Sequence, residues 1–148
     1  MKKLLPILFA TLTGAALLAQ TDEPRRMAMP KITSGVFPWG TPPMTPTKNG
    51  ARSLVFDGPT PTLDRFHCHI STLNPGESTA PLHRHPQEEL VVVKEGTLEI
   101  NIDGKLSTAK TGDILFLSAN ENECRRNVGT TPATYYVFQF FTALTPKS

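Results

Sequence analysis

Short runs of β-branched and aromatic residues, separated by turn residues, make up most of the chain from about residue 52 onward. Such runs are typical of strands, and no segment shows a sustained helical period. Many short strands with frequent turns indicate an all-β fold, which can be a sandwich, a jelly roll or a barrel. We expect strands at 52–56, 64–73, 89–94, 97–102, 105–109, 113–118, 123–128 and 134–142.

One hairpin can be placed from its turn. Apolar and polar residues alternate through 97–102, so one face of that strand is apolar. Asp103-Gly104 follows, and Asp-Gly between two alternating runs favours a two-residue hairpin loop. We therefore expect 97–102 and 105–109 to pair with each other.

Residues 20–50 have a different composition, rich in Pro, Thr, Met and Gly. Proline at this density is incompatible with a regular helix or a central strand. We expect a Pro-rich N-terminal arm that packs on the domain through Phe37 and Trp39, and we place the barrel domain at 51–148.

The first residues have the layout of a secretory signal peptide. Lys2 and Lys3 form a basic start, an apolar run follows at 4–18, and the small residue Ala19 precedes a polar segment. We expect cleavage after residue 19 and export to the periplasm or the cell exterior, with no membrane segment left after cleavage.

The charge of the remaining chain is balanced. Without Lys2 and Lys3, thirteen basic side chains face thirteen acidic ones, and no basic run exceeds two residues. This balance argues against a nucleic-acid partner. Two cysteines remain, Cys68 and Cys124, which export would place in an oxidising compartment. They either pair or remain two buried thiols, and the isolated spacing favours thiols.

The segment around residue 85 carries the chemistry. His83 and His85 are two positions apart, a spacing that puts two imidazoles on one face of a strand. The chain then bends at Pro86, and Glu89 opens the next strand. Two imidazoles and one carboxylate with open positions suit a divalent metal such as Fe(II), Mn(II), Ni(II) or Zn(II).

These residues resemble the first motif of the cupin superfamily, which runs H-x-H, three or four residues, Glu, six residues, Gly. His83, His85, Glu89 and Gly96 fit these spacings. The resemblance covers about 52–142 and is to the small single-domain cupins with one conserved barrel. It implies a double-stranded β-helix, or jelly-roll cupin barrel, with a metal at its centre.

The second cupin motif is in register but altered. Gly112 looks like its opening, and Asn120 replaces a turn glycine whose conformation Asn can adopt. Glu123 stands where the family has its fourth ligand, a histidine. Glu123 is then a fourth metal ligand, a catalytic acid or base beside the metal, or an exposed residue of a decayed site.

Three other features have plainer interpretations. His67 and His69 form a second H-x-H without a matching carboxylate, and we expect them on a solvent or interface face. Arg125 or Arg126 can face the cavity and hold an anionic ligand. Gln139 lies on the face opposite Tyr136, Phe138 and Phe140 and can line the cavity.

The leading functional hypothesis is a metal-dependent enzyme acting on a small oxygen-rich metabolite, by isomerase- or dioxygenase-type chemistry. The altered second motif keeps two alternatives open: a non-catalytic small-molecule-binding module, and a metal-free barrel used for dimer contacts. The family resemblance also implies a homodimer.

Overall fold

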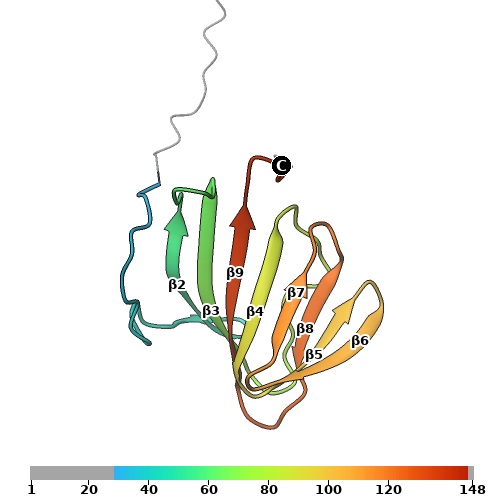
Figure 1. Ribbon diagram of the computed structural model, residues 1–148. Coiled ribbons are helices and arrows are strands. Elements are labelled where there is room, and N and C mark those ends of the chain that lie inside the picture. Colours follow the sequence, from blue (N-terminus) through green and yellow to red (C-terminus); the bar gives the residue numbers. More distant parts are fainter. Residues whose placement is uncertain (1–28, 147–148) are drawn as a thin grey trace, which may run out of the picture.

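The computed structural model describes residues 29–146, which form strands joined by turns and loops, without a helix (Figure 1). The predicted signal peptide lies outside this range. In the described part of the chain, no helix has the length and hydropathy that a membrane span requires. The strands are β1 (Thr45–Thr47), β2 (Gly50–Gly58), β3 (Arg65–Leu73), β4 (Glu88–Glu95), β5 (Thr97–Ile102), β6 (Lys105–Lys110), β7 (Ile114–Leu117), β8 (Glu123–Asn127) and β9 (Ala133–Phe141).

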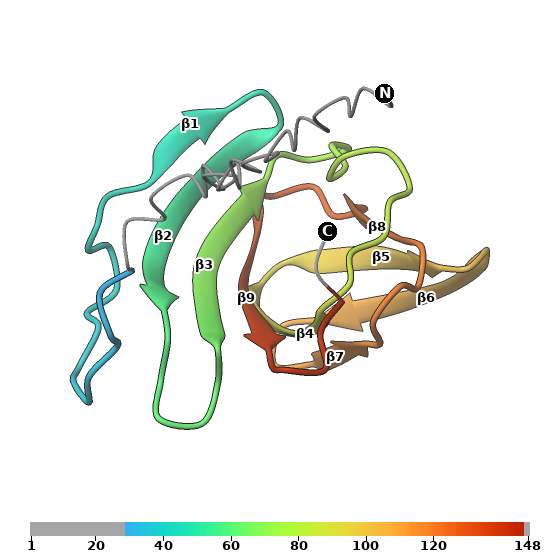
Figure 2. The same ribbon diagram turned by 90° about the horizontal axis from the view of Figure 1, so that it is seen from above.

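The strands form two antiparallel sheets, in the orders β1-β2-β3-β9-β4-β7 and β6-β5-β8. Seen from above, β9, β4, β7, β6, β5 and β8 surround a common interior, and β3, β2 and β1 continue the larger sheet to one side (Figure 2). This is the expected all-β jelly roll. Strand β1 falls inside the range that the sequence assigned to the arm, at the sheet edge where a proline-containing strand is tolerated.

Each expected strand is present, with ends that differ by two residues or fewer. The predicted hairpin is β5–β6, whose register pairs Ile102 with Lys105. Asp103 and Gly104 both have positive φ, 47° and 84°, as a type I′ turn requires. Asn120 also has a positive φ of 64°, which confirms that it takes the turn conformation expected of it.

The barrel interior is apolar at one end and polar at the other. The apolar core comes from the inward residues of both sheets: Leu73, Val91, Val93, Leu98, Ile100, Ala109, Leu115, Leu117, Ala133, Tyr135 and Val137. Buried polar side chains point inward elsewhere, among them Glu89 on β4 and Glu123 and Arg125 on β8. The polar group therefore sits inside the barrel on a rigid, well-packed base.

The outer face of the larger sheet is covered by aromatic rings. Phe66 on β3 stacks on Phe140 of β9 with ring centroids 5.3 Å apart, and it also meets Phe56 of β2. The arm adds Phe37 against Phe56 and Trp39 against the Tyr136 ring. These contacts leave the inner face of β3 to polar residues.

Candidate metal centre

The H-x-H segment is a loop that runs beside β8. The backbones of His83 and Glu123 exchange two hydrogen bonds, of 3.1 and 2.7 Å. Asn120 N–H also donates to the His85 carbonyl at 2.8 Å. Directly paired residues of antiparallel segments project to the same side. The pairing therefore brings the first motif, at His83, next to the altered position of the second, Glu123.

Both histidines of this loop have one ring nitrogen tied to a backbone carbonyl. His85 Nδ1 lies 2.9 Å from the Gln87 carbonyl oxygen, and His83 Nδ1 lies 3.1 Å from that of Pro81. A carbonyl only accepts, so each Nδ1 carries the hydrogen, and Nε2 of the neutral ring offers a lone pair. This is the tautomer in which Nε2 ligates a metal.

Each Nε2 faces a carboxylate. His85 Nε2 is 3.3 Å from Glu89 Oε2, and His83 Nε2 is 3.2 Å from Glu123 Oε1. His85 Nε2 is buried and has no hydrogen-bond partner among the described residues. Two acceptors this close repel each other unless a cation lies between them. One such cation is a proton, because the Glu89 carboxylate outweighs burial and raises the pKa of His85. The other is a metal ion.

Glu89 is held from several sides. It is the second residue of β4, is 2 % exposed, and accepts a hydrogen bond from Gln139 Nε2 at 2.9 Å. Burial alone would raise its pKa, but His85, Arg125 and Gln139 together lower the pKa of Glu89 to about 2. The carboxylate is therefore ionised at neutral pH, as a metal ligand must be. The hydrogen bond also confirms that Gln139 lines the interior.

Glu123 is buried as well, with 1 % of its surface exposed. Glu123 is therefore not the exposed residue that the decayed-site interpretation expected. Its position at the start of β8, opposite the H-x-H loop, turns its carboxylate inward. A ligand role and an acid or base role both remain compatible with this placement.

Arg125 also belongs to the centre, although neither sequence motif specifies it. Its guanidinium is 4 % exposed and forms ion pairs with both carboxylates: Nε donates to Glu123 Oε2 at 3.0 Å, and Nη2 bonds Glu89 Oε1. Burial opposes its charge, but Glu89 and Glu123 outweigh burial and raise the pKa of Arg125 further. The sequence predicts that Arg125 or Arg126 can face the cavity. Arg125 is two positions from the inward-facing Glu123 on β8, so Arg125 is the one that points inward.

Three of the four predicted ligands form a compact group. One ligand atom from each of His85, Glu89 and Glu123 lies within 4.8 Å of the other two. Neighbouring ligands of one first-row ion are about 3.0–3.4 Å apart at bond lengths of about 2.1 Å, so the three side chains must move closer together to bind a common ion. His83 lies outside this group and is half-buried, but its Nε2 faces Glu123. The donor set fits a divalent ion, which would draw carboxylate oxygens from Arg125.

The second H-x-H is also inside the barrel. His67 and His69 were expected on a solvent or interface face, but they are 7 % and 8 % exposed within the single chain, so they do not face solvent. The side chains of β3 alternate as expected, but the aromatic face of the strand is turned outward, where other aromatic rings cover it. The His67 and His69 rings contact each other, with Nε2 and Nδ1 3.0 Å apart, and the Arg52 guanidinium lies beside them.

The two cysteines are free thiols. Cys68 lies on the outer face of β3 and Cys124 on β8, in different sheets. Burial raises the pKa of Cys68 to about 12, so this thiol stays protonated at neutral pH. The interpretation of two unpaired thiols is confirmed.

Comparison with known proteins agrees with the geometry. A family model described as the cupin domain matches residues 69–139, which include the metal group and most of the barrel. No curated protein matches the chain by sequence.

Among solved structures, KdgF from Halomonas sp. superposes with a TM-score of 0.61 at 15 % identity, over 72 % of this chain and 94 % of that one. A cupin 2 conserved barrel domain protein from Salinispora arenicola gives 0.59 at 19 %, over 77 % and 93 %. At these identities the likeness shows the fold.

A sugar phosphate isomerase from the cupin superfamily of Silicibacter pomeroyi is 29 % identical over 52 % of this chain, with a TM-score of 0.48. The chain spans about half of that protein, 51 % of its length. The match of the cupin-domain model, on a chain that folds into the two-sheet barrel, shows that this chain belongs to the cupin superfamily.

Proposed function

We propose that the protein binds one divalent metal ion in its barrel through His83, His85, Glu89 and Glu123. The metal is Mn, Fe, Ni or Zn. We further propose that it uses this centre as an enzyme on a small oxygen-rich metabolite, by isomerase- or dioxygenase-type chemistry. The observation that carries the proposal is the pair of imidazole Nε2 atoms that face carboxylates while both Nδ1 atoms are tied to backbone carbonyls.

A divalent ion at this place polarises the oxygen atoms of a bound metabolite and stabilises negative charge on them. The protein residues supply position and charge. Gln139 and the Gln87 carbonyl orient Glu89 and His85, so the ligands need little reorganisation. Two carboxylates and the Arg125 guanidinium together carry one negative charge. With a dication added, the centre has a net charge of about +1, which attracts an anionic oxygen donor.

Glu123 differs from the family pattern, and its chemistry follows from its contacts. As a ligand, it replaces a neutral imidazole with an anion, which weakens the Lewis acidity of the ion. As a base, it can accept a proton only at an oxygen atom that Arg125 releases. In both roles Arg125 acts as a positioning residue, because its guanidinium holds the Glu123 carboxylate through both Nε and Nη2.

A non-catalytic binding module is the second candidate. The observation that favours it is the double ion pair of Arg125, which neutralises half of the charge of the two carboxylates without a metal. In that case the barrel binds its ligand through charge and shape, and the metal serves recognition or is dispensable.

The test is the metal content of protein purified without chelating resin, measured by mass spectrometry. We expect about one Mn, Fe, Ni or Zn ion per chain. His85→Ala and Glu89→Gln should lose it. Glu88→Gln is the matched control, because Glu88 precedes Glu89 on β4 and is exposed. The proposal is wrong if the purified protein contains no metal and added divalent ions do not change its melting temperature.

Glu123→Gln distinguishes the enzyme from the binding module. In an enzyme, the variant should lose turnover of a candidate hydroxy or keto acid. In a binding module, turnover is absent in the wild type as well, and only ligand affinity changes. If both metal content and ligand affinity equal those of the wild type, Glu123 has no role in the centre.

A further inference from the structure

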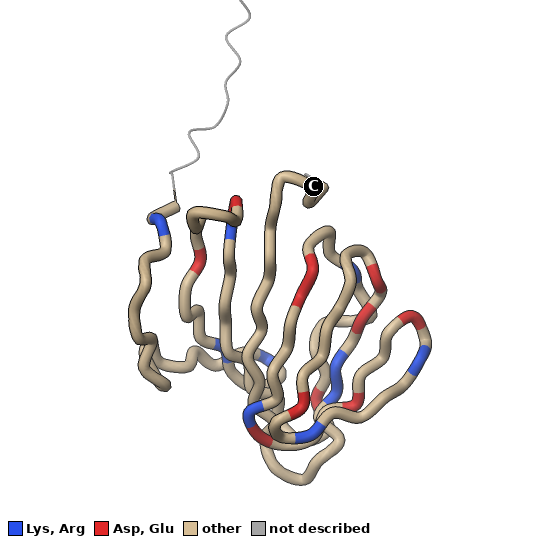
Figure 3. Tube along the Cα trace, in the orientation of Figure 1, with Lys and Arg blue, Asp and Glu red and all other residues tan. Residues whose placement is uncertain are grey.

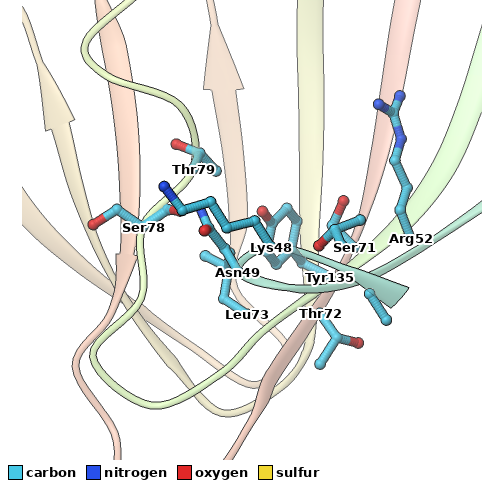
Figure 4. A pocket seen from close by; sticks show the side chains of 11 residues that line it. Lys48, Asn49, Arg52, Ser71, Thr72, Leu73, Ser78, Thr79 and Tyr135 are labelled. Atoms are coloured by element: carbon cyan, nitrogen blue, oxygen red, sulfur yellow. The ribbon is translucent and has the colours of Figure 1, made fainter. Parts of the chain in front are cut away.

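A pocket lies at the other end of the barrel, where the β1–β2 turn meets the last residues of β3 (Figure 4). Its volume is about 220 Å³, roughly that of seven water molecules in the liquid. Drug-sized ligands occupy larger cavities, so this pocket suits a small metabolite. None of the proposed metal ligands lines it.

The lining of the pocket is polar and positively charged. Lys48 and Arg52 supply two cations, and among the described residues no acidic side chain lines the pocket. Residues with hydroxyl groups also line it: Thr47, Ser71, Ser78, Thr79, Tyr135 and Thr72, whose hydroxyl lies 2.9 Å from that of Thr134. Figure 4 shows the Lys48 amine and the Arg52 guanidinium on opposite sides, with the hydroxyl groups of Ser71 and Tyr135 between them.

The charge of Arg52 is not neutralised inside the protein. Within residues 29–146, it forms no ion pair with a carboxylate. Its Nη2 lies instead 3.4 Å from His67 Nε2 and 3.2 Å from His69 Nδ1. Burial lowers the pKa of both histidines, so they are neutral at pH 7 and orient the guanidinium without cancelling its charge.

Lys48 gives the second, independent charge. It lies in the β1–β2 turn, is exposed, and also forms no ion pair with a carboxylate in the described range. The neighbouring Asn49 side chain binds the Ser78 carbonyl, which fixes the turn against the opposite wall. Elsewhere in the fold, acidic and basic positions are mixed along the trace (Figure 3). A pocket with two cations and no acid therefore differs from the surface around it.

We propose that this pocket binds a small dianionic metabolite that carries an oxyanion at each end and hydroxyl groups between them. Arg52 binds one end and Lys48 the other. Ser71 and Tyr135 offer hydroxyl groups to the middle of the ligand. The fork of Arg52 can hold a carboxylate or a phosphate with two hydrogen bonds. This binding needs no metal, so it stands apart from the proposed metal centre.

The test is isothermal titration calorimetry of the full chain in the presence of EDTA, which removes any metal. The probes are D-glucarate, with two carboxylates; 6-phosphogluconate, with a carboxylate and a phosphate; D-gluconate, with one carboxylate; and neutral sorbitol. We expect at least one dianion to bind, gluconate to bind at least tenfold more weakly, and sorbitol not to bind. The stronger dianion then shows whether the second end is a carboxylate or a phosphate.

Arg52→Gln and Lys48→Gln should each weaken the binding of that dianion at least tenfold. Lys105→Gln is the charge-matched control, because Lys105 is exposed at the β5–β6 turn and does not line the pocket. Lys48 is exposed, so its variant tests the pocket even if Arg52→Gln lowers the melting temperature. The proposal is overturned if neither dianion binds, if gluconate binds as tightly as the dianions, or if Lys105→Gln weakens binding as much as Lys48→Gln.

Discussion

The balance of charge at the centre depends on one residue, Arg125. Its guanidinium is buried between two carboxylates that a metal ion also needs. A buried charge is tolerated only where it is paired, and removing one partner of such a pair costs about 3–5 kcal/mol. In the absence of an ion, Arg125 therefore stabilises Glu89 and Glu123. In the presence of a dication, it competes for the same oxygen atoms and repels the ion.

We predict that Arg125→Gln binds divalent metal at least tenfold more tightly than the wild type, a gain of about 1.4 kcal/mol, because a competing positive charge is gone. The metal-free variant should also melt at a lower temperature, and added metal should restore it. Titration calorimetry with Mn(II) and Zn(II) measures the affinity. Arg126→Gln is the control, since Arg126 is the exposed neighbour on β8. Equal or weaker metal binding in Arg125→Gln would contradict the competition.

His69 makes stability depend on pH. Burial, together with Arg52 and His67, lowers its pKa to about 3 in the folded state, against about 6.5 when unfolded. Above pH 6.5 the ring is neutral in both states. Below it, the unfolded chain binds a proton that the folded one does not, so the free energy of unfolding falls as the pH decreases from about 6.5 towards 3, by at most about 1.4 kcal/mol per pH unit.

Urea unfolding of the wild type and of His69→Gln at pH 7.5, 6 and 5 tests this pH dependence. The Gln side chain of the variant cannot ionise. The variant should lose less stability over this range than the wild type. The His85 pKa is shifted upward and contributes with the opposite sign, so the difference between variant and wild type isolates His69. Identical pH slopes for the two proteins would refute the prediction.

At the level of elements, turns fix how the strands meet. Gly96 joins β4 to β5 with φ of 90°, and a Cβ at this position would lie 2.7 Å from the Ala133 Cα at the start of β9. Gly104, in the β5–β6 turn, has a similar φ of 84° but nothing within 4 Å. The glycine that closes the first motif is therefore required both by its conformation and by close packing against β9.

The pair of glycines separates these two effects. We predict that Gly104→Ala costs about 1–2 kcal/mol, the strain of a left-handed conformation. Gly96→Ala should cost about 3 kcal/mol or more, because overpacking against β9 is added. Chemical denaturation of both variants measures the difference. Equal destabilisation would show that β9 yields to the extra methyl group.

For the whole molecule, the arm completes the outer face of the larger sheet. Trp39 meets the Tyr136 ring edge-on at 5.8 Å, and the Lys94 ammonium lies 3.4 Å from the centre of the Trp39 ring. The indole is half-exposed, so it contributes part of its apolar area together with a cation–π contact. These aromatic contacts add to the β1–β2 pairing and to the hydrogen bonds that Ile32 and Pro42 form with the barrel.

We predict that Trp39→Ala lowers the free energy of unfolding by about 1–2 kcal/mol. Val36→Ala is the control within the same arm, because Val36 is 91 % exposed and should change stability by less than about 0.5 kcal/mol. Far-UV circular dichroism follows unfolding in both variants, since Trp39 is the only tryptophan of the chain. A similar loss in both would mean that the indole contacts do not hold the arm.

The metal group shows how far sequence reasoning reaches. Glu89 and His85 meet as the motif spacing predicts, because three residues and a bend at Pro86 separate them. The approach of Glu123 to His83 could not be read from spacing. It depends on the register between a loop and β8, residues 40 positions apart in the chain. The family resemblance predicted the position of Glu123, but not its ion pair with the Arg125 side chain.

Local patterns by themselves determined the strands, the β5–β6 hairpin and the composition of the first motif, because alternation and turn chemistry act over a few neighbouring residues. Only the tertiary structure decided which face of β3 is turned inward. Alternation separated His67 and His69 from Phe66 and Cys68, but both faces of β3 are largely buried, and the packing of aromatic rings outside sent the histidines inside. The same long-range packing placed Arg125 between two carboxylates, because ion pairing inside a barrel depends on strands that meet only after folding.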